Sequence, residues 1–134
     1  MSDTVLYTHD SFLKHRMGLT NPESPVRLEK INELLFASGA LTLLEQKQAP
    51  VAALTDLLAA HDEDYIRFLS NKSPKEGLAQ VNVDTSMNPF TWEAAQHAAG
   101  AACAAVDDIC RGDFKKAFCA VRPPGHHAHR DHSG

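Results

Sequence analysis

The chain of 134 residues is 43% hydrophobic and 22% charged, which is the composition of one ordinary globular domain and excludes a disordered chain. Its net charge of −4 offers no basic surface, so we expect no direct binding to nucleic acid. The sequence has no apolar run long enough to cross a membrane and no targeting signal, and its three cysteines lack a C-x-x-C spacing. Cytoplasmic localisation is therefore predicted.

The first predicted elements are a strand and a long helix. Residues 5–8 form a short apolar run typical of a strand, and residues 9–21 should be irregular. Ser24 can cap a helix that has Pro25 in its first position, and Gly39 should end it. The apolar side chains expected on the buried stripe of this helix are Leu28, Ile31, Leu34 and Leu35.

Strands and helices continue to alternate along the chain, which predicts an α/β domain. Residues 50–54 are predicted to form an edge strand, and residues 56–60 and 62–69 two short helices. The longest helix should span residues 91–111, with Gly112 as its terminator. The side chains expected on its buried face are Trp92, Ala95, Ala99, Ala102, Val106 and Ile109.

The most informative stretch begins with the apolar residues 117–121, which are typical of a strand buried in a parallel sheet. Two prolines at 123–124 end the strand and stiffen the loop, because proline cannot donate to a sheet ladder. Gly125 is free to adopt unusual backbone angles or to let a ligand approach. His126 and His127 follow at the carboxyl end of the strand, where open parallel sheets bind their ligands.

Two adjacent histidines on a rigid loop suit general acid–base chemistry, because imidazole gains and loses a proton near neutral pH. The simpler interpretation is a pair of loop histidines with ordinary hydrogen bonds, but the strand, prolines and glycine favour the chemical one. A His-rich tract of the pair with His129 and His132 is a further metal-binding hypothesis, although no carboxylate or thiolate accompanies it in ligand spacing. We expect residues 129–132 to form a frayed end.

Residues 122–128, Arg-Pro-Pro-Gly-His-His-Ala, resemble the tandem-histidine signature of the histone deacetylase family. These zinc amidohydrolases include acetylpolyamine deacetylases and acetoin-utilisation proteins. Other stretches agree in order and spacing. Residues 21–27 resemble the early loop into the first helix, and residues 60–66 a His-x-x-x-Tyr segment. Residues 84–85, followed by 91–95, resemble the rim loop and the helix after it.

The resemblance implies a role for each matching residue. His126 and His127 would lie beside the metal-bound water, one taking its proton and the other helping to protonate the leaving amine. Asp84 would bind backbone amides of the substrate, and Gly125 would contribute its backbone to the pocket wall. Arg27 would lie at the inner end of the site, near a proposed acetate channel. His61 and Tyr65, in contrast, are expected to pack between helices outside the site.

The fold that the resemblance implies is the arginase/deacetylase architecture, an open, mostly parallel sheet between two helical layers. Residues 1–134 would be the N-terminal portion of a single domain of this type. The family's zinc ligands would follow Gly134, so we expect Zn²⁺ in the complete protein, none held by these residues, and no activity from them alone. The strand at 117–121 would then have an open edge, which predicts poor solubility or oligomerisation.

The predicted function is zinc-dependent hydrolysis of an acetyl amide, with acetylated protein lysine or acetylpolyamine as substrate. The alternative is a non-catalytic fragment or interaction module that keeps part of the fold. Another metallohydrolase of the same fold, such as an arginase-like enzyme, is a third and weaker possibility. Neither the acyl substrate nor the oligomeric state follows from the sequence.

Overall fold

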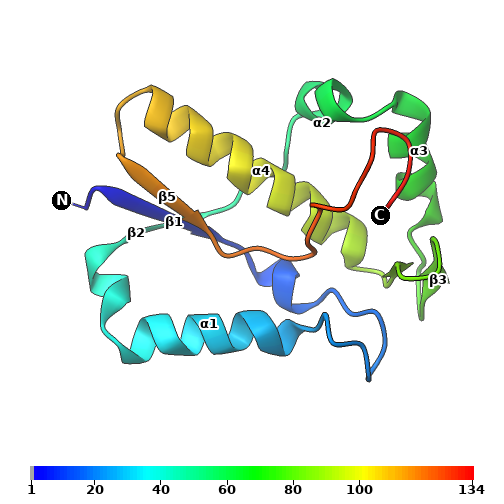
Figure 1. The fold of residues 1–134 in the computed structure, drawn as a ribbon, viewed down its shortest axis with the longest axis horizontal. Helices are drawn as coiled ribbons and strands as arrows, with labels where there is room; N and C mark the ends of the chain where they lie inside the picture. The colour runs from blue at the N-terminus through cyan, green and yellow to red at the C-terminus, as the bar shows by residue number, and fades with distance from the viewer. Residues whose placement is uncertain (1) are drawn as a thin grey trace.

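The main sheet has three parallel strands in the order β2-β1-β5 (Figure 1). The computed structural model describes residues 2–134. β1 (Thr4–Thr8) lies in the centre and buries three consecutive side chains, so both of its faces are covered. β2 (Glu45–Gln48) and β5 (Lys116–Cys119) lie on its two sides. The expected parallel sheet of an α/β domain is confirmed.

Pairing between the strands continues just beyond their ends. The backbone N–H of Ala49 donates to the carbonyl of Thr8 at 2.8 Å, and that of Ala120 donates to the carbonyl of Tyr7 at 2.9 Å. The three strands therefore finish together, and the segments that follow them leave from the same edge of the sheet. This alignment places the loop after β5 beside the segment after β1.

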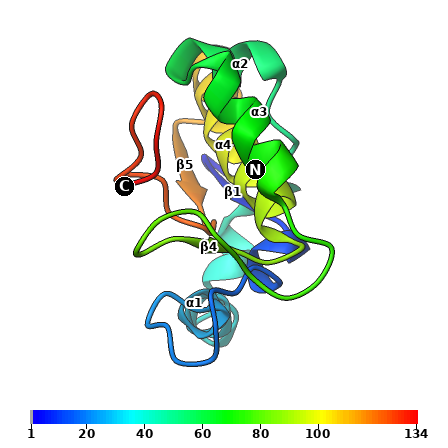
Figure 2. The same cartoon turned by 90° about the vertical axis from the view of Figure 1, so that its right-hand side faces the viewer.

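Helices cover both faces of the sheet, as two views show (Figures 1 and 2). α1 (Pro25–Ala37) lies on one face and α4 (Thr91–Cys110) on the other. Ser24 is the N-cap of α1, as predicted, and Gly39 follows its end with a φ of 77°. Gly112, with a φ of 80°, follows α4. Both glycines occupy the left-handed region that ends helices.

Shorter elements complete the fold beside α4 (Figure 2). α2 (Leu54–Ala60) and α3 (Glu63–Lys72) confirm the two predicted short helices. β3 (Ala79–Gln80) pairs antiparallel with β4 (Ser86–Met87) between α3 and α4. Two 3-10 helices, η1 (Asp10–Leu13) and η2 (Ala40–Leu43), follow β1 and α1. Within residues 2–134, no helix combines the length and apolar character that crossing a membrane requires.

A buried carboxylate ties α4 to the sheet. Asp108, which is 2% exposed, accepts hydrogen bonds from the Tyr7 hydroxyl at 2.5 Å and from Arg111 at 2.6 Å. The Lys47 ammonium on β2 lies 3.3 Å from the same carboxylate. Burial and the adjacent Asp108 raise the pKa of Tyr7 to about 12. These contacts satisfy a charge that would otherwise be costly to bury.

The predicted edge strand at residues 50–54 is wrong. Within residues 2–134 the edge strands of the sheet are β2 and β5. The sequence of β2, Glu-Gln-Lys-Gln, is polar and mostly exposed. An edge strand that faces solvent needs no apolar run, so the hydrophobic pattern did not reveal it. The segment after it instead packs against α4, where the N–H of Ala52 donates to the carbonyl of Gln96 at 3.0 Å.

The buried faces of the two long helices are also rotated from the predicted ones. On α1, Leu28 is buried and Leu35 partly buried, but Ile31 and Leu34 are 41% and 68% exposed. On α4, the predicted residues Ala102, Val106 and Ile109 are exposed. The residues that α4 buries are Thr91, Ala94, Gly100, Ala101, Ala105 and Asp108. Alanine occurs on every side of α4, so the sequence provides little contrast between its faces.

Gly100 fixes how closely α4 approaches the chain. A Cβ atom at this position would overlap the carbonyl oxygen of Pro50 and lie 2.8 Å from the nitrogen of Ala52. Only glycine allows the two backbones to approach this closely. The hydrogen bond between Ala52 and Gln96 and a second one at 2.7 Å, from His97 Nδ1 to the Ala49 carbonyl, form at the same contact.

Candidate active site

The predicted histidine pair lies on the loop that leaves β5 at the carboxyl end of the sheet (Figure 1). Both side chains are exposed. The ring centroids of His126 and His127 are 4.2 Å apart, and the ring planes meet at 54°. The two imidazoles are therefore close enough to exchange protons with one small substrate.

A buried arginine anchors the base of this loop. Arg122 is 4% exposed, and its Nε and Nη2 donate to the two carboxylate oxygens of Glu23 at 2.8 and 2.7 Å. Its Nη1 donates to the backbone carbonyls of Phe12 and His15. The loop after β5 is thus tied to η1 and to the segment before α1. Bidentate pairing of this kind fixes orientation as well as distance.

Sequence reasoning missed the pair formed by Glu23 and Arg122. The signal was present, since each residue belongs to one of the stretches on which the family resemblance rests. Pattern alone gives no reason to pair two charged residues that are 99 positions apart. Only the parallel sheet, which brings the end of β5 next to the segment after β1, makes them neighbours.

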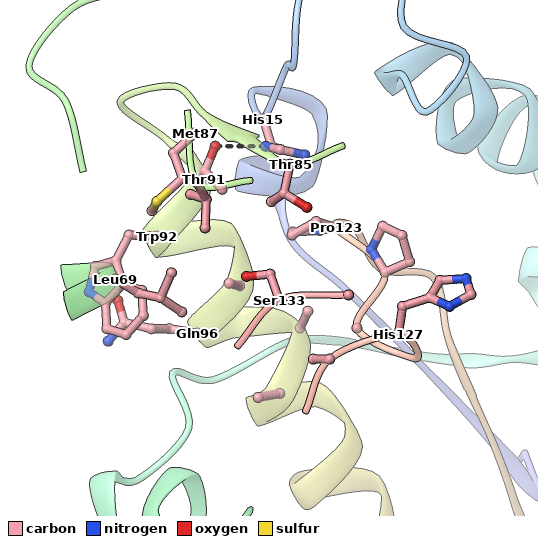
Figure 3. A pocket seen from close by; sticks show the side chains of 18 of the residues that line it. His15, Leu69, Thr85, Met87, Thr91, Trp92, Gln96, Pro123, His127 and Ser133 are labelled. Carbon is pink, nitrogen blue, oxygen red and sulfur yellow. Dashed lines mark hydrogen bonds between the residues drawn. The ribbon is translucent and has the colours of Figure 1, made fainter. Parts of the chain in front are cut away.

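Buried polar groups continue from Glu23 toward α4. His15, which is 1% exposed, has its Nε2 atom 3.5 Å from the Glu23 carboxylate and its Nδ1 atom 2.7 Å from the Thr91 hydroxyl (Figure 3). Burial alone would raise the pKa of Glu23, but the contacts with His15 and Arg122 outweigh it. Together they lower the pKa from 4.5 to about 2. Glu23 is therefore a carboxylate at neutral pH.

The low pKa of Glu23 predicts an acid-sensitive fold. Because the folded state holds this carboxyl group deprotonated more firmly than the unfolded state does, its contribution is complete above about pH 5. As the pH falls from 5 toward 2, we expect the free energy of unfolding to drop by about 3 kcal/mol from this group. Urea denaturation followed by circular dichroism at several pH values measures the drop.

The matched control for acid sensitivity is Glu23→Gln, which cannot ionise. Other carboxyl groups also titrate over this range, so the difference between the two proteins is the relevant quantity. We expect the glutamine variant to be less stable at pH 7 and to lose less on acidification. If the free energies of unfolding of the two proteins fall equally as the pH is lowered, Glu23 is not the responsible group.

A cavity of about 650 Å³ opens beside the histidine loop (Figure 3). Its walls come from α2, α3, the β3–β4 hairpin, the first turns of α4 and the segment after β5. Most of the lining is apolar. The larger apolar side chains in the wall are Met17, Leu57, Ile66, Leu69, Met87 and Trp92. Such a lining with a few polar groups is typical of ligand sites.

The structure brings three of the five predicted site residues to this cavity. Asp84, Gly125 and His127 line it, whereas His126 is outside its lining. The His127 ring points away from the end of the cavity that Trp92 forms (Figure 3). Arg27 lines a second cavity of about 170 Å³ that also includes Phe118 of β5. The chemical roles of all five residues stay predictions.

The predicted frayed end at residues 129–132 is wrong. The N–H of Asp62 donates to the Arg130 carbonyl at 3.0 Å, and the Arg130 guanidinium donates to the Asp62 carboxylate at 2.7 Å. His61 Nδ1 lies 2.9 Å from the carbonyl oxygen of His129. The start of α3 therefore holds this segment. His61 was predicted to pack between helices outside the site, but it contacts the segment after the histidine loop and lines the cavity.

Sequence reasoning also missed two further residues at the site, Ser133 and Gly134. The Tyr65 hydroxyl lies 2.7 Å from the Ser133 hydroxyl, and Tyr65, which was predicted to lie outside the site, lines the cavity. Gly134 lies directly against His127, because a Cβ atom at Gly134 would overlap the Cβ and carbonyl of His127. A glycine seven positions after a histidine gives no sequence signal, and only the folded-back path of the chain reveals the contact.

The histidines do not form a metal-ligand set. Within residues 2–134, no three histidine, cysteine, aspartate or glutamate side chains are grouped closely enough to hold a metal ion. The ring of His129 is stacked on that of His132, with centroids 4.1 Å apart, and does not join the pair at 126–127. The groups present in the described chain therefore do not fit a zinc ion by themselves.

Together, these features define an open-sheet α/β protein with a histidine-bearing loop at the carboxyl ends of its strands. Comparison with known proteins refines this class. The histone deacetylase domain matches residues 21–134. The chain therefore belongs to the histone deacetylase family, and the alternative of an arginase-like enzyme is not supported.

Relatives agree with this assignment. A probable deacetylase of Archaeoglobus fulgidus is 35% identical over 130 residues, which cover 93% of this chain and 35% of that protein. A histone deacetylase-like amidohydrolase of Pseudomonas aeruginosa is 34% identical over 105 residues, or 78% of this chain and 27% of that protein.

The crystal structure of the HDA15 HD domain superimposes with a TM-score of 0.92 at 28% identity, over 99% of this chain and 38% of that one. The arginase/deacetylase fold predicted from the resemblance is thus confirmed. The chain thus spans only 35%, 27% and 38% of the length of these three proteins.

Proposed function

We propose that the protein is a zinc-dependent deacetylase that hydrolyses acetyl amides, with His126 and His127 as its acid–base pair. The observation that carries the proposal is the placement of two imidazoles 4.2 Å apart at the carboxyl end of a parallel sheet, in a chain of this family. One of them, His127, lines the apolar cavity. General acid–base chemistry requires this kind of positioned pair.

The histidines supply the proton transfers of amide hydrolysis. One imidazole accepts a proton from the attacking water as the oxygen bonds to the acetyl carbon. The other donates a proton to the amide nitrogen as the carbon–nitrogen bond breaks, which releases acetate and a free amine. Arg122 and Glu23 hold the base of the loop on which both rings lie.

Zinc would polarise the acetyl carbonyl and activate the water. Because residues 2–134 do not offer a ligand set, the proposal assigns the ligands to sequence outside this chain. We accordingly propose that residues 1–134 alone do not catalyse the reaction. The contribution that we assign to this chain is the acid–base loop, part of the substrate cavity and the rim carboxylate.

Acetylated lysine and acetylated polyamines are the proposed substrates. Both present an acetamide at the end of an alkyl chain, and the mostly apolar wall of the cavity suits that chain. Asp84 is exposed at the cavity, where its carboxylate can accept hydrogen bonds from substrate N–H groups. We propose no direct contact with nucleic acid, in keeping with the net charge of −4.

Assays on the protein expressed from its complete reading frame test the proposal. We expect acetate release from an acetyl-lysine peptide or an acetylated polyamine, loss of turnover with a zinc chelator, and recovery with added zinc. His127→Ala should lower kcat by about 100-fold, because an acid–base group is removed. His132→Ala, which changes an exposed histidine outside the cavity, is the matched control and should retain activity.

Two results would count against the proposal. A complete protein that is folded and zinc-loaded but releases no acetate from any acetylated amine would favour the alternative, a non-catalytic interaction module. Turnover by residues 1–134 alone that disappears in His126→Ala would contradict the assignment of the zinc ligands to other sequence.

A further inference from the structure

The side-chain amide of Asn82 forms hydrogen bonds through both its oxygen and its nitrogen. It lies in the turn between β3 and β4, where its Oδ1 accepts a hydrogen bond from the backbone N–H of Asp84 at 2.9 Å. Its Nδ2 donates to the backbone carbonyl of Ser133 at 3.0 Å. The partners define the orientation of the amide, because a flipped side chain would place two donors together and two acceptors together.

The contacts of Asn82 continue through Ser133 and Gly134 to His127. Ser133 is held twice, at its carbonyl by Asn82 and at its hydroxyl by Tyr65, whose oxygen lies 2.7 Å away. The next residue, Gly134, lies so close to His127 that a single added carbon would overlap its backbone and Cβ. Because there is no free space at this contact, a shift of Ser133 must displace His127 or separate the two segments.

We propose that Asn82 is a positioning residue that fixes the rim carboxylate Asp84 relative to His127. This inference rests on the proposed deacetylase function, in which Asp84 binds the substrate and His127 transfers a proton. One planar amide in the rim turn joins the two groups through Ser133 and Gly134. The substrate and the proton-transfer group are then held in one rigid frame, as catalysis requires.

Asn82→Asp breaks one half of the connection selectively. The aspartate keeps an acceptor for the Asp84 N–H but replaces the donor to Ser133 with a second acceptor, which faces a carbonyl oxygen. Asn71→Asp, on the exposed last turn of α3, makes the same change of charge away from the site and is the matched control. Tyr65→Phe removes the other contact to Ser133 and is a second variant with no change of charge.

Hydrogen–deuterium exchange of the complete protein gives a readout that does not depend on activity. We expect the backbone amides around Ser133 and Gly134 to exchange about tenfold faster in Asn82→Asp, and faster to a smaller extent in Tyr65→Phe. Asn71→Asp should match the wild type. Unchanged exchange at this segment in both Asn82→Asp and Tyr65→Phe would overturn the inference.

Kinetics separate positioning from general stability. In Asn82→Asp we expect kcat to fall about tenfold while KM changes by less than about twofold, because the Asp84 turn keeps its bond. If the wild-type protein deacetylates no substrate but Asn82→Asp still exchanges faster around Ser133, the result supports the inference and contradicts the proposed function. An active wild type whose Asn82→Asp variant keeps both its exchange rates and its kcat would contradict the inference alone.

Discussion

Glu23→Ala should lower the free energy of unfolding by about 3–5 kcal/mol, because it leaves the buried guanidinium of Arg122 without its carboxylate. Arg122 is 4% exposed and donates two hydrogen bonds to Glu23, so the substitution leaves a nearly buried charge without its partner. Small domains are stabilised by about 5–15 kcal/mol in total, and the loss is a large part of that. Urea denaturation at pH 7 gives the value.

Glu63→Ala is the matched control for this prediction. It removes the same side chain from an ion pair with Arg67, but both partners are more than half exposed, at 71% and 61%. An exposed pair contributes at most about 1 kcal/mol, so the variant should be close to the wild type. Equal losses in the two alanine variants would show that the buried pair is no more important than a surface one.

The second large effect is expected at Gly100. Gly100→Ala should destabilise the fold by about 3 kcal/mol, because the new methyl group would overlap the Pro50 carbonyl and push α4 away from residues 50–52. Helix propensity alone predicts the opposite sign, a gain of about 1 kcal/mol when glycine in a helix becomes alanine. The sign of the change therefore distinguishes the two effects. Thermal and urea denaturation both measure it.

A substitution on the exposed side of α4 serves as the control. Ala102→Gly removes a methyl group from an exposed helical position, so it should cost only about 1 kcal/mol through propensity. A stabilised Gly100→Ala protein would show that the two backbones can separate at little cost.

The sequence predicted elements where local chemistry determines them. The helix ends at Gly39 and Gly112 follow from the left-handed region, and the start of α1 follows from Pro25 in its first position, although Ser24 makes no side-chain capping hydrogen bond. The edge strand β2 was not predicted, because its polar side chains are mostly exposed and give no hydrophobic pattern. The buried face of α4 was misplaced, because it is set by the close contact of Gly100 with a distant segment.

The same distinction between local and long-range effects applies to the candidate site. The histidine loop was found because two prolines, a glycine and two histidines follow one another in the sequence. The residues that hold it, Glu23, Arg122 and Ser133, act through contacts with partners far away in the chain. No pattern within a short window can pair such residues. The family resemblance indicated the stretches but not which side chains meet.

The pairing of the central strand with the last one has a consequence for biosynthesis. The Thr8 hydroxyl donates to the carbonyl of Ala120, 112 positions later. Ribosomes add about 5–20 residues per second, so β1 emerges roughly 6–20 s before its partner is made. During that interval α1, β2 and α4 are made, but the backbone of β1 lacks its partner on the β5 side. Chaperones that shield nascent chains are therefore expected to engage this protein during translation.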